Sequence, residues 1–162
     1  MPRVYISIGS NVEREQNIRG AVDKLRAQFG ELTVSPVYES EAVGFVGNNF
    51  LNLVVGFESD LPLAEITKLL RAIERKHGRV RGDQKFSDRT LDLDPLLYGD
   101  LIDHYPPNNV PRHEIGQYAF VLRPLSDIAG EARHPVTGER FANMWSGFEA
   151  NGQRLWEFDL EL

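Results

Sequence analysis

The chain has no cysteine among its 162 residues. Disulfides, a thiolate nucleophile and cysteine-bound zinc or iron–sulfur clusters are therefore excluded, and a cytoplasmic location is the simplest expectation. Long apolar runs are also missing, because the longest fall far short of the roughly 20 residues that a membrane helix needs. The first residues enter a strand-like pattern directly, without the pattern of a signal peptide, so we expect no membrane partner.

Positive charge is in deficit, because 18 lysines and arginines face 24 acids and give a formal net charge of −6. An acidic chain disfavours broad nucleic-acid binding, and a ferredoxin-like RNA-binding module stays only as an alternative that lacks its aromatic strand signature. Residues 71–89 are the exception, since seven cations there face three acids. A basic loop on an acidic body suits a small polyanion such as a nucleotide, although a solvated helix end explains the same charges.

Familiar catalytic motifs are absent as well. The sequence has no glycine-rich Walker loop and no nucleophile elbow, and its four histidines show no metal-ligand spacing. Nothing in it supports nucleophilic catalysis. The length and an apolar content of 41% predict one globular domain over residues 1–162, which we expect to be a monomer.

Hydrophobic periodicity predicts the order β-α-β-β-α-β, followed by a tail. Strands are expected over 4–8, 32–38, 50–58 and 90–98. Helices are expected to end at Gly30 and Gly78, with a further short helix around 119–129. Turns and loops are expected over 9–11, 39–49, 79–89 and 106–111, and the tail is expected to be irregular. This order predicts an α+β, ferredoxin-like fold in which a mixed or antiparallel sheet lies between helices in three layers.

The run RTLDLD at residues 89–94 alternates strictly between polar and apolar residues. In a strand, Asp92 and Asp94 lie on one face, about 7 Å apart at Cα, and the two leucines lie on the other. Two carboxylates this close repel unless a cation lies beside them, and oxygen ligands suit Mg²⁺ together with substrate phosphates. Arg89 can reach the same phosphates, so the run predicts a phosphoryl-transfer site. The alternative is a half-exposed strand whose polar face merely carries aspartate.

The run GRVR at residues 78–81 places two guanidinium groups directly after a predicted helix. A guanidinium group forms bidentate hydrogen bonds with phosphate oxygens and keeps its charge. Arg79 and Arg81 are therefore candidate phosphate ligands. Cations that complement a helix dipole are the alternative, which explains Arg75 and Lys76 better.

The run FLN at residues 50–52 places an aromatic ring and an amide on the same face of a predicted strand. Phe50 and Asn52 together suit a flat heterocycle, which an aromatic plane can stack on and an amide can read. The alternative is a core phenylalanine beside a satisfied buried amide.

Four separated segments match the sequence pattern of a known family, in the same order and at matching spacing. They are YISIGSN at 5–11, FLN at 50–52, the stretch from GRVR at 78–81 through RTLDLDPLLYG at 89–99, and AFVLRPL at 119–125. In these segments the chain resembles the 6-hydroxymethyl-7,8-dihydropterin pyrophosphokinase family. The resemblance implies a Mg²⁺-dependent transfer of pyrophosphate from ATP to the pterin's hydroxymethyl group, leaving AMP, in folate biosynthesis. A pterin-binding relative with weak or altered transfer, in regulation or salvage, is the alternative.

The resemblance also implies roles for individual residues. Asp92 and Asp94 would hold two Mg²⁺ ions and, with Arg79 and Arg89, would be the catalytic residues. The implied ATP-binding residues are Glu74, Arg79, Arg81, Lys85, Arg89 and Arg112. The implied pterin-binding residues are Asn11, Ser40, Val43, Phe50, Asn52 and Phe120, and Phe86 stands in place of a tryptophan in a loop that closes over the site.

Several positions depart from the family pattern, and they concentrate on the nucleotide side. Ser87-Asp88 replaces Gly-Pro before the arginine of RTLDLD, Arg112 replaces a histidine, and Tyr118 replaces an arginine. Pro95 follows the second acid, where an aliphatic residue is common. Because proline removes a donor from the sheet, Pro95 predicts an edge strand or a bulge.

Overall fold

The computed structural model describes residues 1–42, 46–78 and 91–162. In these residues, the strands form one antiparallel sheet of six strands in the order β5-β1-β4-β3-β6, and β2 pairs with β4 beside that path. The strands are β1 (Arg3–Ser10), β2 (Thr33–Val34), β3 (Val37–Ser40), β4 (Phe50–Glu58), β5 (Asp92–Tyr98) and β6 (Leu155–Phe158). The helices are α1 (Arg14–Phe29), α2 (Leu63–Lys76), the 3₁₀ helix η1 (His113–Gly116), α3 (Ala119–Ala129) and α4 (Phe141–Ser146).

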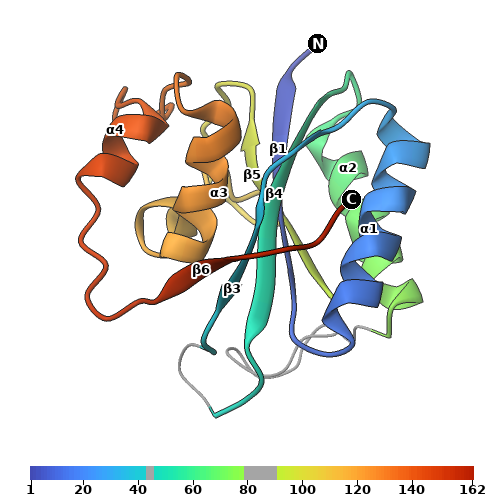
Figure 1. Ribbon diagram of the computed structural model, residues 1–162. Helices are drawn as coiled ribbons and strands as arrows, with labels where there is room; N and C mark the ends of the chain where they lie inside the picture. Colours follow the sequence, from blue (N-terminus) through green and yellow to red (C-terminus); the bar gives the residue numbers. More distant parts are fainter. Residues whose placement is uncertain (43–45, 79–90) are drawn as a thin grey trace.

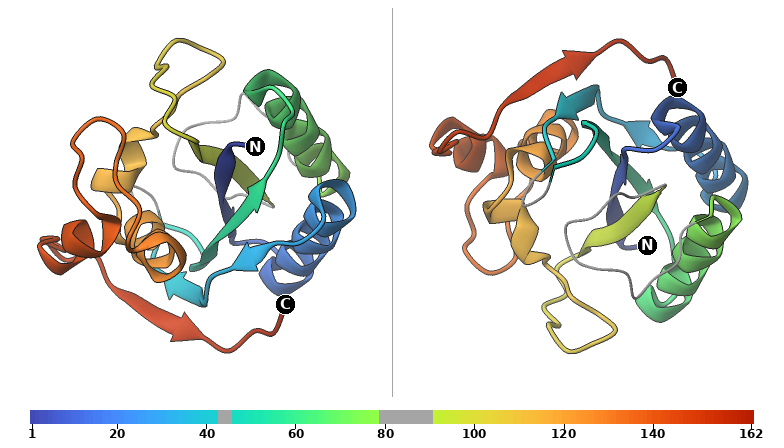
Figure 2. Two further views of the ribbon diagram at one scale, coloured as in Figure 1. Left: turned by 90° about the horizontal axis from the view of Figure 1, so that it is seen from above. Right: turned by 90° about the horizontal axis from the view of Figure 1, so that it is seen from below.

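The elements lie in three layers, with the sheet in the middle. Figures 1 and 2 show α1 and α2 on one face of the sheet and α3 with α4 on the other. The neighbours β5, β1, β4 and β3, with α1 and α2 as the two crossovers on one face, form the split β-α-β core. The α+β, ferredoxin-like prediction is therefore confirmed, and the sheet is antiparallel rather than mixed.

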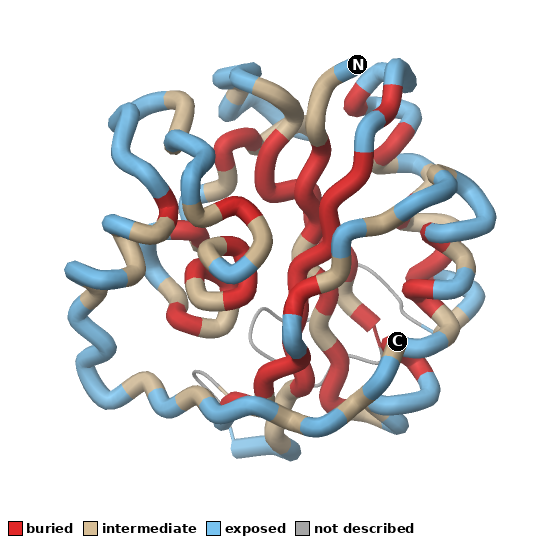
Figure 3. The backbone as a smooth tube through the Cα atoms, turned by 45° about the horizontal axis from the view of Figure 1, so that its top comes forward, coloured by how far each residue is buried: buried red, intermediate tan, exposed pale blue. Residues whose placement is uncertain are grey.

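Two apolar clusters hold the layers together, one on each face of the sheet. On the α1–α2 face, side chains such as Ile18, Leu70 and Leu93 are fully buried. On the α3–α4 face, the cluster includes Leu122 and Phe141, which are buried to 1% exposure or less. Figure 3 shows the buried backbone concentrated along the central strands. None of the helices in the described part of the chain is both long and apolar enough to cross a membrane.

The predicted second strand, over 32–38, is wrong in its extent. Pro36 has no N–H to donate, so the pairing with β4 is interrupted between β2 and β3. Ser35 spans the interruption, because its N–H donates to the Val54 carbonyl at 3.0 Å and its Oγ accepts from the Val54 N–H at 2.9 Å. After this break, β3 continues to Ser40, inside the segment predicted as loop.

The predicted turn over 9–11 is wrong at its first two residues. Gly9 and Ser10 continue β1, where they pair with Asn52 and Leu51 of β4. At the far end of the core, the strand expected from residue 90 starts at Asp92, and Thr90 lies outside the described residues.

The tail is not irregular, because it contains α4 and β6. β6 pairs with β3 and so becomes the outer strand of the sheet. The indole Nε1 of Trp156 donates to Glu39 at 2.9 Å, and the guanidinium of Arg26 in α1 donates to the Leu162 carbonyl at 3.2 Å. Burial alone raises the pKa of Glu39, but the hydrogen bonds from Arg14 and Trp156 outweigh it and hold the pKa of this carboxyl below its ordinary value. The C-terminal strand is thus bonded to the core along its length.

Pro95 confirms the prediction of an edge or bulge in both respects. β5 is the outer strand on its side of the described sheet. The register between β1 and β5 also shifts between Tyr5 and Ile6, where Ile6 pairs with Pro95.

Candidate active site

Four neighbouring strands align predicted site residues in one row. The register pairs Asp92 with Gly9, Gly9 with Asn52, and Asn52 with Tyr38. Directly opposed residues of antiparallel strands share a face. That face is the α3 side, because the Tyr38 hydroxyl donates to the carboxylate of Asp127 in α3. An acid, a residue without a side chain and an amide therefore lie side by side under α3.

The second acid lies one step further along β5. Asp94 pairs with Ser7, about 7 Å from Asp92 by strand geometry, and is 8% exposed. The intervening Leu93 and the preceding Leu91 are fully buried in the α1–α2 core. The alternation predicted from the sequence is therefore present, with both acids on the face away from that core.

Two side chains of α2 bind the backbone of β5 between the acids. The Leu93 N–H donates to Glu74 Oε2 at 2.7 Å, and Arg71 donates to the Leu93 carbonyl at 2.7 Å. Arg71 also lies 2.9 Å from Glu74 Oε1 and 3.3 Å from Asp94 Oδ1. Glu74 is 1% exposed, so helix side chains replace a neighbouring strand at this edge. The proposed contact of Glu74 with ATP stays a prediction.

We expect Glu74→Ala to lower the free energy of unfolding by about 2–3 kcal/mol, because it leaves a buried N–H unsatisfied and removes a charged acceptor. Urea unfolding followed by circular dichroism measures this loss. Glu65→Ala is the matched control on the same helix, since the Glu65–Lys68 pair is exposed and worth at most about 1 kcal/mol. Equal losses in the two variants would contradict the edge-bonding role of Glu74.

Arg112 approaches Asp94 from the opposite side. Its backbone N–H donates to the Leu96 carbonyl at 3.0 Å, which places the residue beside β5. Its guanidinium lies 3.6 Å from Asp94 Oδ2 and 3.1 Å from Glu114 Oε2. Asp94 is thus flanked by guanidinium groups from α2 and from the segment before η1, each of which also pairs with a second carboxylate, Glu74 or Glu114.

The two aspartates form a donor set that fits Mg²⁺. Mg²⁺ typically takes one or two carboxylates from the protein and completes its shell with water and substrate phosphates. Asp92 and Asp94 offer that number of carboxylates on one strand face. Within the described residues, no group of three or more histidine, cysteine, aspartate or glutamate side chains gathers as a metal cage. Two carboxylates leave most of the Mg²⁺ shell to water and phosphates, so the pair suits a metal that binds together with a phosphate substrate.

The amide of Asn52 is held in one orientation. Its Nδ2 donates to Ser40 Oγ at 2.8 Å, and the residue is only 5% exposed. Its Oδ1 lies over Gly9, where an added Cβ would be 3.0 Å away and also 3.9 Å from a ring carbon of Phe50. An oriented acceptor beside an aromatic ring therefore flanks Gly9, where a side chain would come into close contact with the amide.

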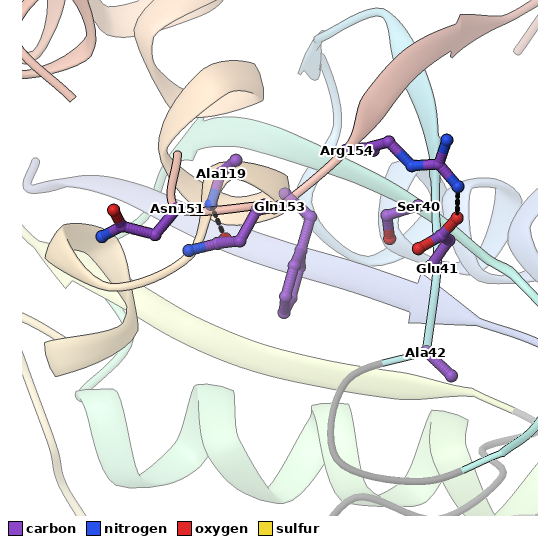
Figure 4. Close-up of a pocket in the computed structure, with 9 residues that line it drawn as sticks. Ser40, Glu41, Ala42, Ala119, Asn151, Gln153 and Arg154 are labelled. Atoms are coloured by element: carbon purple, nitrogen blue, oxygen red, sulfur yellow. Dashed lines mark hydrogen bonds and ion pairs between the residues drawn. The ribbon is translucent and has the colours of Figure 1, made fainter. Parts of the chain in front are cut away.

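A cavity of about 160 Å³ lies at the end of β3 (Figure 4), and one of its lining residues is Ser40, the hydrogen-bond partner of Asn52. It brings together Ser40 at the end of β3 and Phe120 in α3, two residues predicted to contact the same ligand. The remaining lining residues are Glu41, Ala42, Ala119 and the C-terminal segment Asn151–Arg154. Sequence reasoning missed this C-terminal contribution.

Asn11 lies at the end of β1 and is 2% exposed. Its Nδ2 donates to the Asn48 carbonyl at 3.2 Å, and Arg14 donates to the Asn49 carbonyl at 3.2 Å. These two bonds fix the segment that leads into Phe50. Asn11 thus fixes the backbone of the segment before Phe50, and its implied contact with the pterin stays a prediction.

Several predicted site residues lie outside the described residues. They are Val43, Arg79, Arg81, Lys85, Phe86 and Arg89, together with the substituted positions Ser87 and Asp88. Their roles stay predictions.

His77 is the C-cap residue of α2, and its ring contacts side chains of α1. Its Nδ1 lies 2.7 Å from Asn17 Oδ1 and its Nε2 3.1 Å from Lys24 Nζ. Nδ1–H donates to the amide oxygen and Nε2 accepts from the ammonium group, so the ring is neutral. Burial and then the charge of Lys24 lower the pKa of His77 below 6.5.

We expect His77 to make the protein less stable in mild acid. The unfolded chain binds a proton near pH 6.5 that the folded ring accepts only at lower pH, so stability falls as the pH drops from 6.5 toward the folded pKa. Melting temperatures between about pH 5 and pH 8 should therefore vary less in His77→Gln than in the wild type. His113→Gln, at an exposed ring, is the control that should keep the wild-type dependence.

The comparisons with known proteins point to one family. The sequence profile described as 7,8-dihydro-6-hydroxymethylpterin-pyrophosphokinase (HPPK) matches residues 5–130. The 2-amino-4-hydroxy-6-hydroxymethyldihydropteridine pyrophosphokinase of Pseudomonas aeruginosa is 37% identical over 137 residues, which are 82% of this chain and 84% of the relative. The protein of the same name from Aquifex aeolicus is 33% identical over 84% of this chain and 86% of its own length.

Solved structures share the fold at low sequence identity. The crystal structure of a Plasmodium falciparum HPPK-DHPS triple mutant with pteroate aligns with a TM-score of 0.70 over 90% of this chain, at 11% identity. The present chain spans 43% of the length of that protein. The fold and the sequence matches place the chain in the pyrophosphokinase class of transferases. It belongs to the 7,8-dihydro-6-hydroxymethylpterin-pyrophosphokinase family.

Proposed function

We propose that the protein transfers pyrophosphate from ATP to the hydroxymethyl group of 6-hydroxymethyl-7,8-dihydropterin, in folate biosynthesis. The observation that carries the proposal is the row of Asp92, Gly9 and Asn52 across three strands, in a chain of this family. On one face of the sheet, the row offers an acid for the phosphates and an amide for the ring, and a glycine lies between them.

The pterin side is built to hold a flat ring that offers N–H donors. Because Nδ2 of Asn52 is bonded to Ser40, the Oδ1 is the atom that accepts hydrogen bonds from the ring's amino and N–H groups. Phe50 and Phe120 supply the aromatic planes that flank the ring. Asn11 and the segment around Ser40 and Val43 complete this proposed subsite.

The phosphate side works through charge and positioning. The hydroxymethyl oxygen forms a bond to the β-phosphorus of ATP, the bond from that phosphorus to the oxygen bridging to the α-phosphate breaks, and AMP leaves. Asp92 and Asp94 would hold two Mg²⁺ ions, which neutralise phosphate charge. Arg71 and Arg112 add positive charge beside Asp94, and no protein nucleophile is needed. The proposed ATP contacts also include Glu74, Arg79, Arg81, Lys85 and Arg89.

We propose further that residues 1–162 act as a single domain, as a monomer and in the cytoplasm. The single sheet that the described strands form supports the first point, and the two small substrates are compatible with the second. The lack of cysteine is compatible with the third.

A direct assay tests the transfer. The purified protein is incubated with ATP, Mg²⁺ and 6-hydroxymethyl-7,8-dihydropterin, and AMP and the pterin diphosphate are separated by chromatography. We expect equal amounts of the two products, and neither product when the pterin or Mg²⁺ is omitted. The absence of both products from the complete mixture would overturn the proposed transfer.

The ion pair of Arg112 with Asp94 favours a second candidate, a pterin-binding relative with weak transfer. The guanidinium of Arg112 lies beside Asp94, the proposed metal ligand, so it competes with Mg²⁺ for the same carboxylate. Calorimetry with the pterin, Mg²⁺ and a non-hydrolysable ATP analogue separates the candidates. Pterin binding without AMP release supports the second, whereas catalytic AMP release supports the first.

A further inference from the structure

The cavity lined by Ser40 and Phe120 has a wall that comes from outside the region matched by the family profile. That region ends at residue 130, whereas Asn151–Arg154 line the cavity. The wall starts as a tight turn, in which the Gln153 N–H donates to the Ala150 carbonyl at 2.9 Å. Its two central residues, Asn151 and Gly152, have φ values of 48° and 84°. Asparagine and glycine are the residues that adopt this left-handed backbone most readily, so the turn is specified locally.

The side chain of Gln153 joins this turn to the start of α3. Its Oε1 accepts from the Ala119 N–H at 2.8 Å, and its Nε2 donates to the Gln117 carbonyl at 3.0 Å. The N-cap residue of α3 is Tyr118, which supplies no side-chain cap in the described part of the chain. Gln153 therefore satisfies one of the N–H groups that a helix leaves unpaired at its start.

The turn also reaches the other side of the cavity. Arg154 forms an ion pair with Glu41, which follows directly after Ser40 at the end of β3. Figure 4 shows Gln153 directed toward Ala119 and Arg154 directed toward Glu41. The C-terminal turn thus connects the two elements that carry Ser40 and Phe120.

We propose that the turn at residues 150–154 is a wall of the pterin pocket and that Gln153 is a positioning residue for Phe120. Phe120 is the second residue of α3, so its backbone follows the helix turn that Gln153 caps. Its ring stacks on Tyr118 with centroids 5.0 Å apart and lines the cavity. The proposal rests on the proposed function, because it assigns the cavity to the pterin.

The test compares Gln153→Ala with the wild type in pterin binding and in steady-state kinetics. We expect the pterin Kd and the pterin KM to rise about fivefold to tenfold, which is the worth of one to two hydrogen bonds. The KM for ATP and the kcat should stay within about twofold. Glu149→Ala, at an exposed position just before the turn, is the matched control and should leave all four values unchanged.

Gln153→Glu keeps the acceptor for the Ala119 N–H and loses the donor to the Gln117 carbonyl, so we expect an intermediate pterin Kd. This variant also provides the test if Gln153→Ala does not fold. A role in stability alone predicts a lower melting temperature with an unchanged pterin Kd, and that result overturns the inference while the proposed function stands. A wild-type protein that binds no pterin overturns the proposed function itself.

Discussion

Asp92→Asn is expected to lower turnover by about 10²–10³-fold, the size of effect typical for loss of one charge-stabilising group at a transferring centre. The substitution keeps the shape of the side chain and removes its charge, so it weakens any hold on a cation without adding bulk. Asp92 is half-buried and pairs with Gly9 at the edge strand. Initial rates of AMP formation at several Mg²⁺ concentrations measure the loss, and the pterin Kd should stay near that of the wild type.

Asp94→Asn should lower turnover similarly and should also reduce the melting temperature. Asp94 lies 3.3 Å from Arg71 and 3.6 Å from Arg112, so its neutralisation leaves two guanidinium groups with one fewer partner. Asp100→Asn, in the exposed turn after β5, is the control for both substitutions. Equal losses of thermal stability and activity in Asp92→Asn would instead favour a structural role for the acid.

Gly9→Val is expected to weaken pterin binding by about 10- to 100-fold, the range that overpacking of about 1–3 kcal/mol produces. A Cβ at this position already lies 3.0 Å from Asn52 Oδ1, the atom proposed to accept from the ring. The two further methyl groups of valine would lie between that amide and Asp92. Fluorescence titration with the pterin measures the affinity, and far-ultraviolet circular dichroism checks the fold.

Gly116→Ala is the matched control for this substitution. A Cβ at Gly116 meets no heavy atom of the described chain within 4 Å, so affinity and stability should stay unchanged. Wild-type pterin affinity in Gly9→Val would show that the ligand does not lie over the row, and the proposed pocket would have to be abandoned.

The parts of the fold that could be predicted from sequence are those whose signal is local and strong. α2 and β4 have apolar residues at the spacing of their own element, and they were found at nearly their observed extents. β6 is four residues long and was missed, and it is a strand because β3 pairs with it. Tertiary pairing therefore decides elements that carry too little periodicity to be recognised.

The same distinction applies to the candidate site. The alternation in RTLDLD predicted correctly that Asp92 and Asp94 lie on the sheet face opposite the α1–α2 core. A glycine inside a strand pattern is a signal for close approach, and it could have identified Gly9 before the register did. Gln153 offered no such signal, because the N–H that it caps lies 34 residues earlier in the chain.

The pairing of β6 with β3 has a consequence for how copies of this chain meet one another. An outer strand presents unpaired N–H and C=O groups that can recruit a strand from another molecule. β6 is only four residues long and carries Glu157 in its middle. The sheet therefore ends on this side in a short, charged edge strand. The stretch 150–158 thus combines the proposed wall of the pterin pocket with a strand that discourages edge-to-edge pairing between copies of the chain.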